Sequence, residues 1–111
     1  MKRDRLELVE DMLKKNPKDV FLNYAAALEY LKINELDKAS DLFTNVIQLD
    51  KKYVGAYFQL GKIFESQSQD QKAIDIYTKG CNIAREINDQ KSLGELTEAL
   101  MILDEDYDGA W

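Results

Sequence analysis

The sequence of 111 residues predicts an all-α protein, an α-solenoid of about six antiparallel helices packed as hairpins. Two observations predict this fold class. Apolar residues recur at the spacing of one helix face along most of the chain. One pattern of residue types also occurs twice, 34 residues apart, and internal similarity at such a period is typical of helical repeat proteins.

The repeated pattern covers residues 20–53 and 54–87. Several residues are identical to the one 34 positions later, and these pairs are Val20/Val54, Lys38/Lys72, Ala39/Ala73, Asp41/Asp75 and Thr44/Thr78. Others keep their chemical character, and these are Tyr24/Phe58, Tyr30/Phe64, Leu42/Ile76, Phe43/Tyr77 and Leu49/Ile83. The similarity spans both helices and the turn between them, so chance is a poor explanation.

This pattern resembles the tetratricopeptide repeat (TPR), whose signature is W-x2-L-G-x2-Y, then A-x3-F, then P. Residues 54–87 match at Leu60, Gly61, Phe64, Ala73 and Tyr77. Tyr57 stands in the Trp place and Arg85 in the Pro place. Residues 20–53 match more loosely, with Asn23 and Lys51 in those two places. The resemblance implies a right-handed superhelix of helix pairs.

The residue types of the repeat have a physical role of their own. Small residues such as Ala27 let helix backbones approach closely, and aromatic residues fill the space between helices. Helical spacing predicts burial before it predicts chemistry. We therefore predict a packing role for the repeat core, which comprises Tyr30, Ala39, Phe43, Tyr57, Leu60, Gly61, Phe64, Ala73 and Tyr77.

The N-terminal segment, residues 2–15, predicts an amphipathic cap helix. Its apolar face comprises Leu6, Val9, Met12 and Leu13. Val9 and Met12 lie 34 residues before Phe43 and Val46, so the segment has the register of a second repeat helix. A half-repeat of this kind can cap a solenoid. Pro17 then breaks the helix, and Asp19 is a good N-cap for the next one.

The helices expected after this cap are residues 19–33, 35–49, 53–67, 70–87 and 90–103. Asn34 is suited to a left-handed helix end, and residues 66–69 read as a polar turn. The second of these helices should bury Leu36, Ala39, Leu42, Phe43, Val46, Ile47 and Leu49. We expect one domain over residues 1–104, followed by an acidic tail at residues 105–111.

The closing helix, residues 90–103, matches the repeat at an offset of 36 residues rather than 34. A two-residue extension near residues 85–89 would explain the change of register. The residues available for packing are Leu93, Leu96, Ala99, Leu100 and Leu103. Met101 and Ile102 are additional apolar residues on a cap that should turn a polar face outward, and they indicate a further contact.

The charge of −6 is concentrated at one end of the chain. Residues 1–19 carry six basic and five acidic groups, whereas residues 88–111 carry one basic and seven acidic groups. With no basic face, binding to nucleic acid or to an anionic membrane is disfavoured. A single cysteine, Cys81, predicts a small buried apolar group in a reducing compartment, and we expect a cytoplasmic protein.

The sequence offers little for catalysis. It has no histidine and one cysteine, so it cannot assemble a nucleophile–His pair or an N/S zinc site by itself. We expect no enzyme activity and no cofactor. Residues 104–109 match the first half of a calcium loop but lack the bidentate Glu six positions later, so a solvated acidic tail is the preferred interpretation.

The resemblance implies a protein-interaction module whose first helices line a concave groove. An apolar stripe of Phe21, Tyr24, Leu28 and Leu31 would face that groove, Phe58 would continue it, and Gln59 and Lys62 would form its polar edge. One TPR subtype grips a ligand carboxylate through Lys, Asn and Arg. Tyr24, Leu28 and Gln59 occupy those places here, so apolar contact should hold the ligand instead.

Other functions stay open on the sequence alone. The chain could be a self-associating unit that uses the groove or the closing helix, a homo-oligomer in that sense. It could also be a fragment of a larger TPR protein, or an enzyme that borrows a partner's groups. In the preferred interpretation Glu95 and Glu98 favour a ligand with basic residues, and nothing in the sequence identifies the partner protein or peptide.

Replacing a small core residue tests the repeat register. We expect Ala73→Leu to lower the free energy of unfolding by about 1–3 kcal/mol through overpacking. Gln71→Leu, on the face predicted to be exposed, should change it little. Urea denaturation of both variants makes the measurement, and equal effects would contradict the register.

Overall fold

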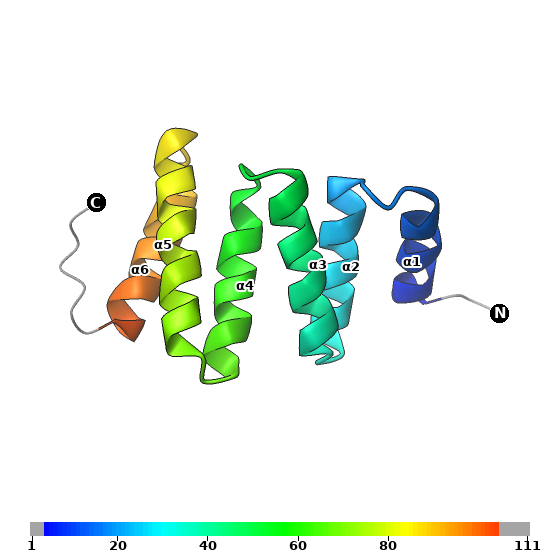
Figure 1. Ribbon diagram of the computed structural model, residues 1–111, viewed down its shortest axis with the longest axis horizontal. Helices are drawn as coiled ribbons and strands as arrows, with labels where there is room; N and C mark the ends of the chain where they lie inside the picture. The colour runs from blue at the N-terminus through cyan, green and yellow to red at the C-terminus, as the bar shows by residue number, and fades with distance from the viewer. Residues whose placement is uncertain (1–3, 105–111) are drawn as a thin grey trace. The chain divides into compact units, whose positions relative to one another are not determined.

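The computed structural model describes residues 4–104, and these residues form six α-helices and no strand (Figure 1). The helices are α1 (Arg5–Lys15), α2 (Val20–Lys32), α3 (Leu36–Leu49), α4 (Val54–Ser66), α5 (Asp70–Glu86) and α6 (Gln90–Leu103). The predicted all-α fold class and the number of helices are confirmed.

Side chains and turn conformations set where the helices begin and end. Asp4, Asp19 and Asp89 accept hydrogen bonds from backbone N–H groups three residues later, at 2.8, 2.9 and 3.0 Å. These bonds satisfy donors that the first helical turn leaves unpaired. At the other ends, Asn34 and Ser68 adopt left-handed φ angles of 60° and 57°. The prediction for Asn34 is confirmed.

The described chain divides into two compact units, one containing α1 to α3 and the other α4 to α6. In the first unit α2 contacts both α1 and α3. In the second, α5 contacts both α4 and α6, and α4 also touches α6. A single domain ending at residue 104 stays a prediction.

The predicted change of register between α4 and α6 has a visible origin. α5 has 17 residues, whereas α3 has 14. Both begin at equivalent positions, Leu36 and Asp70, so the three extra residues lie at the end of α5. α6 then begins at Gln90, which is 36 positions after Val54 at the start of α4.

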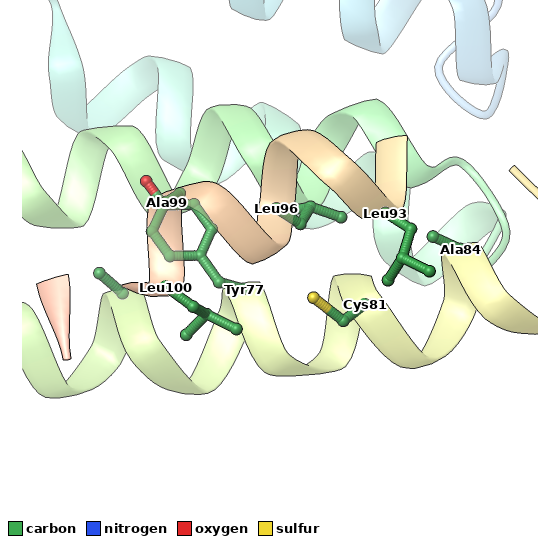
Figure 2. Close-up of a cluster of buried hydrophobic side chains, with 8 residues drawn as sticks. Tyr77, Cys81, Ala84, Leu93, Leu96, Ala99 and Leu100 are labelled. Atoms are coloured by element: carbon green, nitrogen blue, oxygen red, sulfur yellow. The ribbon is translucent and has the colours of Figure 1, made fainter. Parts of the chain in front are cut away.

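The core of the second unit lies between α5 and α6 (Figure 2). Figure 2 shows side chains of both helices meeting along their length. The buried cluster comprises Ala73, Tyr77, Cys81, Ala84, Leu93, Leu96, Ala99 and Leu100. Cys81 is 2% exposed, with Sγ 3.9 Å from Thr97 Oγ1. Burial raises the pKa of its thiol, which agrees with the predicted role as a small buried group.

Glycines bring the helices of this unit close together. A Cβ atom on Gly61 in α4 would overlap the ring of Tyr77 in α5, and one on Gly80 in α5 would lie 2.8 Å from Tyr57 Cβ in α4. Each aromatic residue is therefore opposite a glycine on the partner helix. The Tyr77 ring and the Tyr57 Cβ can lie this close to the partner helix only because those positions lack a side chain.

The core of the first unit is smaller. Val9 of α1 packs with Ala25 and Ala26 of α2, and Leu13 and Leu42 cover this contact. Between α2 and α3, the rings of Tyr24 and Phe43 meet edge to face, with centroids 5.5 Å apart and planes at 67°. Such an arrangement places the positive edge of one ring against the face of the other.

Asn23, which takes the Trp place of the first repeat, is 2% exposed. Its amide nitrogen donates to the carbonyl oxygens of Pro17 and Asp19, at 3.0 and 2.8 Å. A buried polar group without partners would be costly. The amide is tolerated because it holds the connector between α1 and α2 against the start of α2.

Two predicted core residues, Tyr30 and Phe64, are only half-buried. They occupy the same place in the two repeats, and a lysine covers each ring. Lys38 Nζ lies 5.4 Å from the Tyr30 centroid, and Lys72 Nζ lies 5.9 Å from that of Phe64. The other predicted core residues, Ala39, Phe43, Tyr57, Leu60, Gly61, Ala73 and Tyr77, are buried.

The burial prediction for Leu49 is wrong, and Met12, on the apolar face of the predicted cap helix, is exposed. Met12 is 52% exposed because no helix of the described chain covers that face of α1. Leu49 is 39% exposed because it is the last residue of α3, where the helix runs out into the turn. Leu36, Leu42 and Ile47 are half-buried.

Alanine substitution at two glycines tests where a helix backbone is in close contact with a neighbouring side chain and where it is open. Gly61→Ala should lower the free energy of unfolding by about 1–3 kcal/mol, because the new Cβ overlaps the Tyr77 ring. A Cβ on Gly94 would meet nothing within 4 Å, so Gly94→Ala should raise it by about 0.5–1 kcal/mol through helix propensity. Urea denaturation monitored by circular dichroism measures both, and a stabilising Gly61→Ala would show that α4 and α5 are not in close contact.

Candidate functional site

The residues predicted to line a groove lie on α2 of the first unit and α4 of the second. On α2, Phe21 is 66% exposed, whereas Tyr24, Leu28 and Leu31 are half-buried. The Tyr24 ring contacts Phe43, so it belongs partly to the core of its own unit. Phe21 is therefore the most accessible apolar residue of this stripe.

The α4 residues make contacts of a different kind. Phe58 is half-buried and packs against Tyr77, with ring centroids 6.3 Å apart. Lys62 Nζ lies 5.5 Å from the centroid of the Phe58 ring and 3.8 Å from a Glu65 carboxylate oxygen. Gln59 is half-buried. The structure thus brings Phe58 and Lys62 into contact, as a cation above an aromatic face.

A hollow of about 160 Å³ lies between α4 and α6. Its walls combine two predicted groove residues with a row of α6 residues, and the lining comprises Phe58, Lys62, Glu95, Glu98, Ala99 and Ile102. Gln59 is not among the lining residues. An aromatic ring, an exposed isoleucine and charges of both signs therefore share one concave surface within the second unit.

The charged groups of this hollow differ in how they are paired. Lys62 is bound to Glu65, which also accepts a hydrogen bond from the Tyr77 hydroxyl. Glu95 and Glu98 are exposed, and neither is in an ion pair with another residue between 4 and 104. The two carboxylates are available to a positively charged ligand group, whereas the one cation is already engaged.

The sequence reasoning did not assign Ala99 or Ile102 to the groove. The 36-residue register of the closing helix relates the α6 wall of the hollow to α4. At that offset Glu95, Glu98, Ala99 and Ile102 correspond to Gln59, Lys62, Ile63 and Ser66 of α4. The predicted groove residues Phe58, Gln59 and Lys62 map to Gly94, Glu95 and Glu98. The register therefore identifies the two glutamates but not Ala99 or Ile102, whose counterparts Ile63 and Ser66 were not predicted groove residues.

The described residues were also compared with the requirements of a metal site and of a membrane-spanning helix. In the part of the chain that the structure describes, no three His, Cys, Asp or Glu residues are grouped to hold a metal ion. No helix there is long and apolar enough to cross a bilayer. The calcium-like motif at residues 104–109 falls outside the described residues except for Asp104.

Comparisons with known proteins point to one family. No family model matches the chain. The solution structure of a tetratricopeptide repeat domain protein from Salinibacter ruber is 38% identical to it, with a TM-score of 0.76. That match covers 83% of this chain and 93% of the Salinibacter chain.

Two further matches are a solved domain and a longer protein. The TPR2B domain of yeast Sti1, solved as a complex with pHsp70, has a TM-score of 0.83 at 17% identity, covering 92% of this chain and 82% of that domain. Lipopolysaccharide assembly protein B of Escherichia coli strain K12 is 36% identical over 55 residues, which cover 50% of this chain and 14% of that protein. The chain thus spans a small part of this longer relative.

Introducing a charge on α2 distinguishes surface from core positions. We expect Phe21→Glu to leave the thermal midpoint almost unchanged, because this side chain is 66% exposed. Leu28→Glu should lower the midpoint, since Leu28 is half-buried and a carboxylate there loses hydration. Thermal unfolding followed by circular dichroism measures both, and a large drop for Phe21→Glu would place that residue in the core.

Proposed function

Because the chain belongs to the tetratricopeptide repeat family, we propose that it is a protein-interaction module, an adaptor or scaffold that binds a peptide or helix through the concave faces of its first helices. The observation that carries the proposal is the hollow between α4 and α6, where Phe58 and Ile102 offer apolar contact beside the carboxylates of Glu95 and Glu98. On α2, in the other unit, we propose a further apolar contact through Phe21, Tyr24, Leu28 and Leu31, and on α4 a polar edge through Gln59 and Lys62.

The ligand we propose has apolar anchors and at least one basic residue. Amphipathic helices and extended peptides bind such surfaces through anchors at regular spacing. In the hollow, Lys62 is held by Glu65 and lies over Phe58, so it is poorly placed to attract an acidic group. The two unpaired carboxylates on α6 favour an arginine or lysine of the ligand.

The solved relatives support a binding role in general terms. The Sti1 domain was solved as a complex with pHsp70, so a chain of this fold can hold another protein's segment. At 17% identity that ligand is not transferred to this protein. In our proposal the protein is not an enzyme and binds no cofactor, nucleic acid or membrane. Its location in the cytoplasm stays a prediction.

A pair of labelled peptides tests the ligand chemistry. We expect a synthetic amphipathic peptide with leucine anchors and arginines to bind, as measured by fluorescence anisotropy, and the same peptide with glutamates in place of the arginines to bind more weakly. Glu98→Lys should weaken binding of the arginine peptide by roughly three- to tenfold, because an attraction in the hollow becomes a repulsion.

The matched control is Asp75→Lys, which makes the same change of charge at an exposed α5 position outside the hollow. It should leave the affinity nearly unchanged. Equal losses for the two variants would mean that net charge alone governs binding. The proposed ligand chemistry would be contradicted if neither peptide binds or if the glutamate peptide binds more tightly.

A further inference from the structure

A pocket of about 420 Å³ lies in the first unit and is formed by residues of α1, α2 and α3. Its apolar lining comprises Leu13 of α1, Pro17 of the connector, Ala26 and Tyr30 of α2, and Leu42 of α3. Ligand pockets in proteins are commonly of this size and are lined mainly by apolar side chains. This first-unit pocket shares no lining residue with the hollow between α4 and α6.

The repeat pattern explains why the first-unit pocket is open. Ala26 pairs with Leu60 at the 34-residue offset, and Leu60 occupies the Leu place of the tetratricopeptide signature. Leu60 is 4% exposed, so in the second repeat this larger side chain fills the core. The first repeat has only a methyl group there, with Leu13 and Leu42 packed around it. The shorter side chain therefore leaves space at the floor of the pocket.

The pocket lies on the side of α2 that faces away from the predicted groove stripe. Successive residues of an α-helix are rotated by about 100°, so residues two positions apart point in nearly opposite directions. Ala26 is two positions from both Tyr24 and Leu28 of that stripe. A ligand in the first-unit pocket therefore does not compete with one bound along the stripe.

Three of the charged residues that line the pocket lie toward its Tyr30 end, namely Glu10, Lys38 and Asp41. The Tyr30 hydroxyl donates to Glu10 Oε1 at 2.8 Å, and Lys38 Nζ lies 5.4 Å from the centre of the Tyr30 ring. Asp41 is three residues after Lys38 on α3, so the two charges are neighbours on the helix surface and offset each other. With Glu10 included, this end carries a net negative charge, which disfavours an anionic group there.

The fourth charged lining residue, Lys14, differs from the other three. It lies about one helical turn beyond Glu10 on α1, toward Pro17, and it is exposed. Glu10 is already bound to Tyr30, and within residues 4–104 Lys14 is in no ion pair or hydrogen bond through its ammonium group. The ammonium group is therefore available to an anionic group of a ligand at the Pro17 end of the pocket.

We propose that the first-unit pocket binds a small carboxylate with an unbranched apolar body. The apolar body lies over Ala26, between Leu13 and Leu42, and the carboxylate reaches Lys14. The reverse orientation is disfavoured, because it brings the carboxylate to the negatively charged Tyr30 end. The ligand is opposite in charge to the one proposed for the hollow between α4 and α6, and the two sites have no lining residue in common. Failure of either proposal therefore leaves the other standing.

The test is an NMR titration of the isotope-labelled protein with three probes that share one alkyl chain, namely octanoate, octylammonium and 1-octanol. We expect octanoate to shift the amide signals of Leu13, Ala26 and Leu42 saturably, octanol to bind more weakly and octylammonium most weakly. Lys14→Gln should weaken octanoate binding roughly two- to fivefold and leave octanol binding unchanged, because only the carboxylate uses that charge. The matched control is Lys15→Gln, an equal change at an exposed α1 position outside the pocket, and it should alter neither affinity.

Chain length and pocket filling give a second measurement. Each CH2 group added between butanoate and octanoate should strengthen binding by up to about fourfold. Ala26→Leu places the leucine of the second repeat at the floor of the pocket and should abolish binding of all three probes. Circular dichroism melts verify that this variant folds, and if it does not, the Lys14 variant and the chain-length series decide.

Several results overturn the proposal. These are octanoate shifts that do not saturate or that lie only outside the first-unit pocket, octylammonium binding as tight as that of octanoate, and full binding by a folded Ala26→Leu variant. A loss for Lys15→Gln as large as that for Lys14→Gln also overturns it, because net charge alone would then govern binding.

Discussion

The contact between the Tyr77 ring and the backbone at Gly61 is the constraint on which the second unit depends. It fixes how closely α4 and α5 approach, and Tyr77 belongs at the same time to the cluster that buries α6. The contact also reaches the surface. The Tyr77 hydroxyl donates to Glu65, and Glu65 holds Lys62 above the Phe58 ring. The orientation of groups in the hollow is thus tied to packing in the core.

The two repeats solve the same packing problem with different chemistry. Where the second unit has Tyr77 and Glu65, the first has Phe43 and Leu31 at the equivalent positions. A ring without a hydroxyl needs no acceptor, so an apolar residue replaces the glutamate. The stripe of α2 predicted to face a groove is therefore apolar, whereas the hollow between α4 and α6 mixes apolar and charged groups.

Helices α1 and α6 both carry exposed apolar side chains. Within residues 4–104, α1 has the register of a second helix with no first helix before it, and α6 that of a first helix with no second helix after it. Leu8, Met12, Met101 and Ile102 are exposed on these two helices. The apolar periodicity that builds the interior thus continues onto the outer faces of α1 and α6.

The sequence by itself determined the helices, their order and most of the core, because 34-residue similarity and turn residues such as Pro17 and Asn34 act locally. It also indicated Met101 and Ile102 as unexplained apolar residues. Only the tertiary structure decided that Asn23 is buried around two connector carbonyls, that lysines cover Tyr30 and Phe64, and that Glu95 and Glu98 share a hollow with Phe58. Helical periodicity states which face a residue occupies. Whether that face meets a helix, a lysine stem or open space depends on neighbours far apart in the chain, and only packing brings these together.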